Sequence, residues 1–336
     1  MKRDKAVAED RAKALDAAKR RQEQSKYKYL LGQVERLEKD LEAVGQLRHH
    51  VETFSIKPKE RTNTSEAVAV IVASDWHHEE VVEPRTVNDL NAHNLTISKI
   101  RAERFFQGGL RLWQITKRDV KIDTIVLALL GDFISNDIHD ELMETCEVLP
   151  MEAILSVQGI LISGIRFLLK NTPCNLVIPC HGGNHARTTK KQRHATDTGH
   201  SLEWYMYHNM VNVFKDEPRV KFVISGGYHS YLNVYDQVIR FHHGHDIRYQ
   251  GGVGGLTIPA NKAIAQWNKA KTADIDVLGH WHQRFDAGNF LCNGSLIGFN
   301  AFALSIKAGY EPPSQLFFLL DKKRGKTIVA PILVED

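Results

Sequence analysis

The chain has 336 residues, of which 43% are hydrophobic, so it is long enough to bury one large core or two modest ones. No uninterrupted apolar run approaches the roughly 18 residues of a membrane span, and the charged N-terminus lacks the apolar core of a signal peptide. The net charge of +4 and four scattered cysteines fit a polyanionic partner and a reducing compartment. We therefore expect a cytoplasmic protein that does not associate with membranes.

Residues 1–53 are rich in strong helix formers, which predicts a helical extension. Apolar residues in its second half recur at spacings of 4, 3, 4 and 3, as in the a/d seam of about two heptads: Leu30, Val34, Leu37, Leu41 and Val44. This seam predicts either a short coiled coil, through which the chain forms a homo-oligomer or binds a partner, or a single helix lying on the globular domain. Residues 54–66 read as a polar linker, and residues 67–336 as the globular domain.

Short apolar runs alternate with helical patterns from residue 67 onward. The runs that predict strands are 67–73, 123–130, 174–180, 220–224, 231–234, 237–241 and 275–278. The helical patterns cover 91–118, 151–169 and 199–214. Strands joined by helices form parallel pairs, so the turns that follow them meet at one sheet edge, where open α/β sheets bind ligands. In the tail, Asn293-Gly294 predicts a hairpin turn.

Five of the predicted strands end in turns that carry carboxylate, amide or imidazole groups. The turns contain Asp75-Trp-His77, Gly131-Asp132, Gly183-Asn184-His185, His243-Gly-His245 and Gly279-His280-Trp-His282. Imidazole nitrogen and carboxylate oxygen are ligands of first-row divalent metals. One such turn is more often a simple turn former, but five in series predict a metal centre at the sheet edge.

In this order, the five motifs resemble those of the calcineurin-like metallophosphoesterases, including the nucleases that process DNA double-strand breaks. The resemblance covers about residues 67–300. It implies an α/β fold, a four-layer α/β/β/α sandwich around two sheets, with the helical segment as an extension. It also implies two divalent metal ions, with Mn as the first expectation and Fe, Zn or Ni as alternatives.

The resemblance also assigns roles to individual residues. The first ion would be held by Asp75, His77 and His282, the second by Asn184, His243 and His280, and both by a bridging Asp132. A hydroxide between the two ions would attack phosphorus, with Asp132 and His185 as the catalytic residues and His185 serving the leaving oxygen. His242 and His245 remain alternative ligands beside His243, which is preferred because it directly precedes glycine, as in the family.

One departure from the family concerns the residue after His185. Many members carry an acidic residue there that helps to orient the histidine, and this chain has Ala186. We expect another group to orient the imidazole, and the nearby stretch Asn136-Asp-Ile-His139 offers candidates.

A basic run directly follows the third motif and would suit a substrate with several phosphates: Arg187, Lys190, Lys191 and Arg193. Tyr249, Trp267 and Trp281 could stack on bases or belong to the core. The leading hypothesis is a phosphodiesterase that cleaves nucleic acid, with DNA as the expected substrate. The alternatives are a phosphomonoesterase acting on proteins or small molecules, and an adaptor whose metal site is vestigial.

Overall fold

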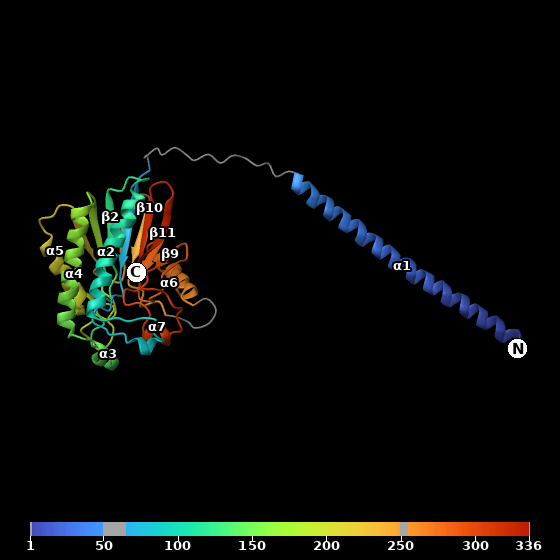
Figure 1. The fold of residues 1–336 in the computed structure, drawn as a ribbon, viewed down its shortest axis with the longest axis horizontal. Helices are drawn as coiled ribbons and strands as arrows, with labels where there is room; N and C mark the ends of the chain where they lie inside the picture. Colours follow the sequence, from blue (N-terminus) through green and yellow to red (C-terminus); the bar gives the residue numbers. More distant parts are fainter. Residues whose placement is uncertain (1, 50–64, 249–254, 336) are drawn as a thin grey trace. The chain divides into compact units, whose positions relative to one another are not determined.

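The computed structural model describes residues 2–49, 65–248 and 255–335, and the chain divides into two units, 1–60 and 61–336. In the first unit, α1 (Lys2–His49) is one continuous helix, which confirms the predicted helical extension (Figure 1). The side chains of Leu30, Val34, Leu37 and Leu41 are between 50% and 75% exposed on it. The expected linker lies outside the described residues as far as position 64.

The second unit contains two β-sheets. The first has the strand order β11-β10-β1-β2-β3-β4, in which β1 to β4 are parallel and β10 and β11 antiparallel. Its strands are β1 (Ala67–Ala73), β2 (Thr124–Leu129), β3 (Asn175–Cys180), β4 (Val220–Ile224), β10 (Ser314–Asp321) and β11 (Gly325–Leu333). The second has the order β5-β6-β7-β9-β8, with β6, β7 and β9 parallel. Its strands are β5 (Ser230–Val234), β6 (Gln237–Phe241), β7 (Ile275–Leu278), β8 (Phe285–Asp286) and β9 (Phe290–Cys292).

The continuous apolar run of β1 is explained by burial on both of its faces. Ala69 and Ile71 belong to the core on the helical side of the sheet, whereas Val70 and Val72 belong to the core between the two sheets. All four side chains are at most 1% exposed. A strand covered on both faces has no position that favours a polar residue, which is why its sequence does not alternate.

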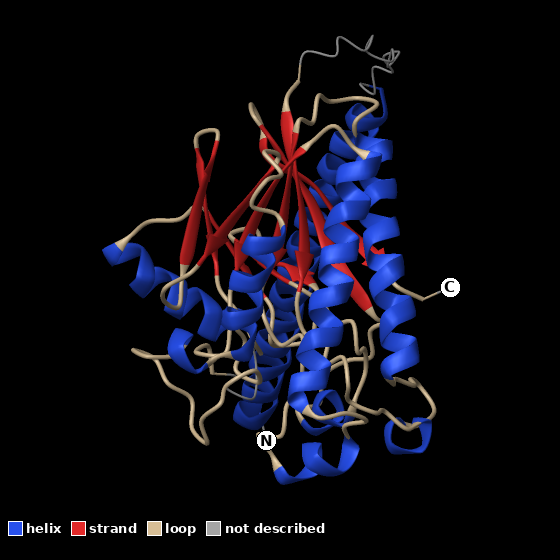
Figure 2. Ribbon diagram, turned by 90° about the vertical axis from the view of Figure 1, so that its left-hand side faces the viewer, coloured by secondary structure: helices blue, strands red, loops and turns tan. Residues whose placement is uncertain are grey.

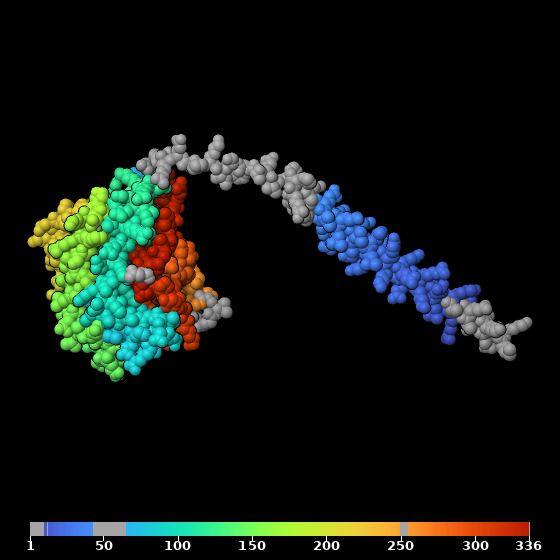
Figure 3. Space-filling view, viewed as in Figure 1, coloured from blue at the N-terminus to red at the C-terminus, as the bar shows by residue number. Residues whose placement is uncertain are grey.

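Helices cover the outer face of each sheet. The main core joins the first sheet to α2 (Leu95–Thr116), α4 (Pro150–Asn171) and α5 (Leu202–Val213). A smaller core joins β7 and β9 to α6 (Thr257–Ala270) on the far side of the second sheet. Figure 2 shows the strands flanked by these helices, and in Figure 3 the cyan-green α2 lies between the green α4 and the red β11. The predicted four-layer α/β/β/α arrangement is confirmed.

Helix α4 is the one helix among the described residues that is long and apolar enough to cross a membrane by length and composition. Its sequence is not one uninterrupted apolar run, because polar residues such as Gln158 and Arg166 divide it. Its buried residues, which include Val157, Leu161 and Leu168, belong to the main core of the globular unit. Packing against the first sheet therefore accounts for its apolar character.

The predicted hairpin turn at Asn293-Gly294 is wrong. The antiparallel pair β8–β9 turns earlier, where the N–H of Ala287 donates to the carbonyl of Phe290 at 3.0 Å. The side chain of Asn293 instead donates to Ser74 Oγ and accepts from the backbone N–H of Leu316, both at 2.8 Å. Asn293 thus connects the end of β9 to the loop after β1 and to β10, a long-range role that a local turn signature cannot reveal.

The topology places five strand ends at one end of the sandwich. In the first sheet Ala73, Leu129 and Cys180 are successive register partners at the last positions of β1, β2 and β3. In the second sheet β6 and β7 run in parallel. Short helices lie in the connecting loops: η1 (Pro84–Val87), α3 (Asp140–Thr145), η2 (Thr198–His200) and α7 (Ala301–Ser305).

Candidate metal centre

The loops that follow β1, β2, β3, β6 and β7 bring their polar side chains together. Among the described residues, three groups have one potential ligand atom from each member within 4.8 Å of the others. The groups are Asp75 with His77 and His282, Asp132 with His77 and His185, and Asp132 with His243 and His280. Because Asp132 belongs to two groups and His77 links the first two, the groups form one continuous cluster.

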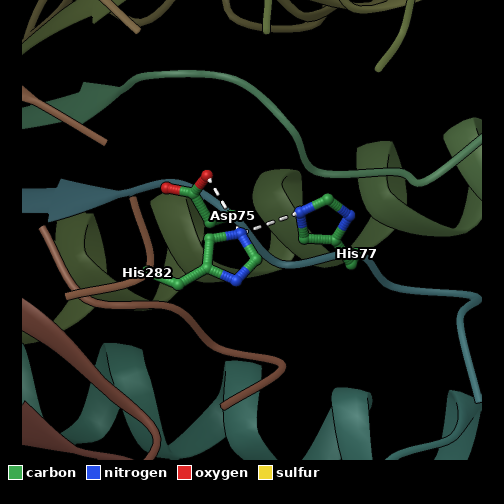
Figure 4. Close-up of side chains that lie close together, drawn as sticks. All are labelled: Asp75, His77 and His282. Carbon is green, nitrogen blue, oxygen red and sulfur yellow. Dashed lines mark hydrogen bonds and ion pairs between the residues drawn. The ribbon is translucent and has the colours of Figure 1, made fainter. Parts of the chain in front are cut away.

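The first group has a close arrangement of two imidazoles and a carboxylate (Figure 4). The Nε2 atoms of His77 and His282 lie 3.2 Å apart, and Asp75 Oδ1 lies 3.6 Å from His282 Nε2. Asp75 is fully buried and its carboxylate accepts from Ser74 Oγ and from the backbone N–H of His280, the latter at 3.0 Å. The loops after β1 and β7 are therefore joined through the proposed ligands themselves.

The third group is arranged around Asp132. His243 Nε2 lies 2.9 Å from Asp132 Oδ2 and 3.2 Å from Asn184 Oδ1, and the rings of His243 and His280 have centroids 5.2 Å apart. The other oxygen of Asp132 accepts from the backbone N–H of His185 at 2.8 Å. All seven residues expected to hold two ions therefore lie in this cluster, with Asp132 between the two halves.

The tautomers of two histidines suit metal binding. His243 Nδ1 lies 2.7 Å from the carbonyl oxygen of Leu130, which can only accept, so Nδ1 carries a proton and Nε2 is the nitrogen that can bind an ion once it has lost its own proton. Ser135 Oγ donates to Glu80 Oε2 at 2.7 Å and therefore accepts from His77 Nδ1 at 2.8 Å. The Nε2 of His77 is thus also left with a lone pair, and the donor set fits divalent first-row ions.

The electrostatics of the cluster favour neutral imidazoles in the first group. Burial lowers the pKa of His282 to about 3 and, together with His185, holds the pKa of His77 well below its usual range. Burial raises the pKa of Asp75 to about 7.

In the third group, the positive charge of His243 pairs with the negative charge of Asp132. Burial lowers the pKa of His243, but the neighbouring Asp132 carboxylate outweighs burial and raises that pKa to about 9. Burial raises the pKa of Asp132, but His243 and His185 outweigh it and hold that pKa well below its usual range. His243 Nε2 and Asp132 Oδ2, which lie 2.9 Å apart, therefore stabilise each other's charged forms.

The backbone at the cluster is strained. Five of the expected ligands have φ in the left-handed region, between 46° and 70°: Asp75, His77, Asp132, His280 and His282. This conformation costs non-glycine residues about 1–3 kcal/mol each and is found where surrounding structure over-determines it, often at functional sites. The turns therefore aim these side chains into the cluster at a cost to stability.

Two glycines allow the loops to approach each other. A Cβ atom at Gly183 would collide with the carboxylate and backbone of Asp132, and one at Gly279 would collide with the side chains of Ser74 and Asp75. To relieve either collision, Asp132 or Asp75 would have to shift, and both are expected ligands. Steric exclusion of a Cβ atom therefore explains why glycine occupies positions 183 and 279.

Glu203 of α5 connects two loops of the cluster by hydrogen bonds, and none of the sequence motifs predicts this role. Its carboxylate accepts from the backbone N–H of Phe133 and from that of Gly183, each at 2.7 Å. It thereby joins the loop of Asp132 to that of Asn184. Burial raises the pKa of Glu203 to about 8, with Asp132 adding to the effect and the two N–H groups opposing it. No local pattern distinguishes this glutamate from others on a helix.

A backbone carbonyl orients the ring of His185, and the residue at position 186 is Ala186. His185 Nδ1 lies 2.9 Å from the oxygen of Ser135, so Nδ1 carries the proton and Nε2 is left to exchange one. From the expected stretch, the Asn136 amide donates to the carbonyls of His185 and Arg187, and the His139 ring lies 6.2 Å from that of His185. Asn136 therefore positions the backbone of His185, and Ser135 its ring.

The other histidines lie outside the three groups. His242 Nε2 faces Asp276 at 3.3 Å, and the ring of His245 lies 5.5 Å from that of His243. His181 Nε2 lies 2.7 Å from Ser230 Oγ, and the His229 ring packs against Trp267.

The predicted substrate-binding cations are not equivalent. Arg187 is partly buried and donates to the carbonyls of Asn184 and Thr189, so its guanidinium holds its own loop. Lys190, Lys191 and Arg193 are exposed.

The aromatic residues considered for base stacking also differ from one another in their surroundings. Trp281 is buried, with 7% of its surface exposed, and Trp267 packs on His242 and Arg240. Tyr249 lies outside the described residues.

No protein-family model matches the chain, and no curated protein matches it. Among solved structures, it is similar to hypothetical protein PH1004 from Pyrococcus horikoshii, with 13% identity, a TM-score of 0.38, and coverage of 80% of this chain and 89% of the other. It is also similar to a predicted phosphoesterase from Streptococcus pneumoniae, with 12% identity, a TM-score of 0.26, and coverage of 75% and 82%. A third similar structure is zinc-complexed Vps29 from Entamoeba histolytica, with 12% identity, a TM-score of 0.29, and coverage of 79% and 99%. Likenesses this distant support no inference about activity.

Proposed function

We propose that this chain is a dinuclear-metal-dependent phosphodiesterase of the calcineurin-like metallophosphoesterase type, and that it cleaves nucleic acid, with DNA as the expected substrate. The observation that supports it is that Asp132 belongs to two groups of side chains that could hold a metal ion, one with His77 and His185 and one with His243 and His280. A carboxylate has two oxygens, so one residue at this place can serve two ions. The donor set of imidazoles, carboxylates and an amide suits Mn, Fe, Zn or Ni.

In this proposal the first ion is held by Asp75, His77 and His282, the second by Asn184, His243 and His280, and both by Asp132. When bound, two such ions neutralise charge on the phosphoryl oxygens and lower the pKa of a water molecule. The chain itself fixes their places through the strained turns described above. The vestigial-site alternative would not explain why five residues retain a costly backbone conformation around one cluster.

His185 serves the leaving group. A water molecule gives up one proton to solvent and its oxygen bonds to phosphorus, the bond from phosphorus to the ester oxygen breaks, and Nε2 of protonated His185 gives its proton to the departing oxygen. The carbonyl of Ser135 holds the ring in the tautomer that this role needs. The proximity of His185 to His77, with ring centroids 4.8 Å apart, keeps that nitrogen at the edge of the metal cluster.

Exposed cations on the loop after His185 suggest a substrate that carries more than one phosphate. Lys190, Lys191 and Arg193 are all exposed and lie within nine residues of His185 along the chain. Cations so placed can contact neighbouring phosphates of a strand, and such contacts weaken as salt concentration rises. Arg187 is excluded from this set, because its guanidinium donates to backbone carbonyls.

The helix α1 would serve self-association. Its apolar seam is exposed within its own unit, and an exposed heptad seam is covered most simply by the same seam of a second copy. We propose a homo-oligomer formed through residues 30–44.

A screen of metals against substrates tests the proposed activity. The purified chain, loaded in turn with Mn, Fe, Zn, Ni or Mg, would be given bis-p-nitrophenyl phosphate, p-nitrophenyl phosphate, and single- and double-stranded DNA and RNA. We expect hydrolysis of the diester and of DNA, with Mn most effective. Hydrolysis of the monoester alone would indicate a phosphomonoesterase, and inactivity with every metal would contradict the proposal.

A further inference from the structure

An exposed aromatic ring stands beside the metal cluster. Phe302, in the first turn of α7, is 40% exposed, whereas the next residue, Ala303, is 1% exposed. Its ring and the ring of His282 pack edge to face, with centroids 5.6 Å apart and an interplanar angle of 66°. A single exposed phenylalanine needs no explanation, but this one contacts an expected metal ligand.

The turn that carries the Phe302 ring is fixed by hydrogen bonds to residues beside the metal cluster. The side chain of Asn300 caps α7 by accepting from Ala303 N at 3.1 Å, and its amide donates to Glu80 Oε1 at 3.2 Å. Glu80 in turn accepts from Ser135 Oγ, which holds His77. The turn that carries Phe302 is therefore tied to the same hydrogen-bonded network as the first metal group.

Phe302 is also the last ring in a series of neighbouring rings, His185, His77, His282 and Phe302. The centroid of His185 lies 4.8 Å from that of His77, and the centroid of His77 lies 5.0 Å from that of His282. The next ring is Phe302. In a phosphate whose leaving oxygen is near His185, the retained substituent is carried by a different oxygen, and His282 and Phe302 are the rings that follow His77 in this series of contacts.

We propose that Phe302 stacks against an aromatic group on the retained substituent of the substrate, the one that stays on phosphorus after cleavage. This inference rests on the proposed function and narrows its substrate class to phosphodiesters that carry a planar ring near the scissile bond. A nucleobase and a simple aryl group share this chemistry, since each offers a π face to the exposed phenyl ring.

The test compares three diesters with the same p-nitrophenol leaving group, so that the chemical step stays constant. Their retained groups are thymidine, phenyl and methyl. For the wild type we expect KM to be about tenfold lower for a ring-bearing diester than for the methyl diester, as for one stacked ring. Phe302→Ala and Phe302→Leu should abolish this difference and leave the methyl diester unchanged, and Phe302→Tyr should preserve it. Preference for thymidine identifies a nucleobase, and preference for phenyl an aryl group.

Two controls separate the possible failures. Leu304→Ala removes a side chain that is 44% exposed on the same helix and should leave all three KM values unchanged. Calorimetric titration with Mn should give the same affinity for Phe302→Ala as for the wild type. A KM increase shared equally by all three diesters, or a loss of metal affinity, would show that Phe302 only shields His282 and would overturn the inference. If no diester is hydrolysed at all, the proposed function itself fails.

Discussion

The Nε2 atom of His77 lies 3.2 Å from the Nε2 atom of His282, although the two residues are 205 positions apart in the chain. The Nδ1 proton of His77 is used on Ser135, so its Nε2 carries a lone pair. The Nδ1 of His282 is buried without a hydrogen-bond partner. For the two Nε2 atoms to form a hydrogen bond, that of His282 must carry a proton and donate it to His77. A cation between the rings would instead bind the lone pair of each Nε2 atom.

Metal removal should therefore lower stability. A ligand that binds only the folded state at about 100 times its Kd stabilises by ~2.7 kcal/mol. For a chain of this size we expect Tm to fall by several degrees after dialysis against a chelator and to recover with added Mn. Differential scanning calorimetry measures the shift. An identical Tm with and without metal would mean that the cluster is not filled.

Asp132→Asn should affect both halves of the centre at once. The amide lacks the negative charge and one of the two acceptor oxygens, so a shared ligand is lost. We expect hydrolysis to fall by about 100-fold or more, since changes to groups that merely support metal ligands already cost ~10–100-fold. Asp137→Asn makes the same chemical change at an exposed position of the same loop and should leave the rate near that of the wild type.

His185→Ala should have an effect that depends on the leaving group. General acids contribute roughly 10²–10⁴-fold, and they matter less when the departing oxygen is already acidic. We expect a small loss with bis-p-nitrophenyl phosphate and a large loss with DNA, while Mn affinity stays unchanged. His200→Ala removes an exposed histidine and is the matched control. Equal losses on both substrates would argue against a proton transfer by His185.

Glu203 should make stability depend on pH. Burial raises its folded pKa to about 8 from an ordinary 4.5, so the folded state binds the proton more tightly than the unfolded state. The resulting stability is present below about pH 4.5 and is lost as pH rises toward 8. Relative to Glu203→Gln, the metal-free wild type should lose a few kcal/mol across this range, at ~1.4 kcal/mol per pKa unit. Urea denaturation at pH 5 to 8 measures the difference, and a constant difference would contradict the raised pKa.

The seam of α1 should determine the oligomeric state. Leu37→Ser together with Leu41→Ser removes two successive apolar seam positions, and we expect a monomer by light scattering. Arg36→Ser with Lys39→Ser changes two exposed residues beside the seam and should preserve the wild-type mass. A monomeric wild type, or an unchanged mass in the Leu37 and Leu41 variant, would reject self-association through this helix.

The sequence predicts the layers and the main strands because their signals are local. The run 67–73 is apolar throughout and becomes β1 with the same bounds, and the helical pattern over 91–118 becomes α2, from Leu95 to Thr116. The Asn293-Gly294 prediction failed because an asparagine whose partners lie far away in the chain, after β1 and in β10, resembles a turn residue when only its sequence neighbours are considered.

The cluster is predictable only in part, for a related reason. The residues expected as ligands lie at strand ends, where a local motif and a parallel topology together place them at one edge. The groups that hold these side chains and their loops by hydrogen bonds lie outside the motifs. They are the carboxylate of Glu203 in α5 and the backbone carbonyls of Leu130 and Ser135. A backbone carbonyl has no residue identity, so no sequence pattern could have indicated that Ser135 orients His185.

The central claim, that five loops hold two divalent ions, is tested most directly by anomalous diffraction from a crystal soaked in Mn. We predict two peaks about 3.5–4 Å apart, the first beside Asp75, His77 and His282, the second beside Asn184, His243 and His280, and Asp132 between them. A single ion remote from Asp132, or no peak among these side chains, would contradict the account.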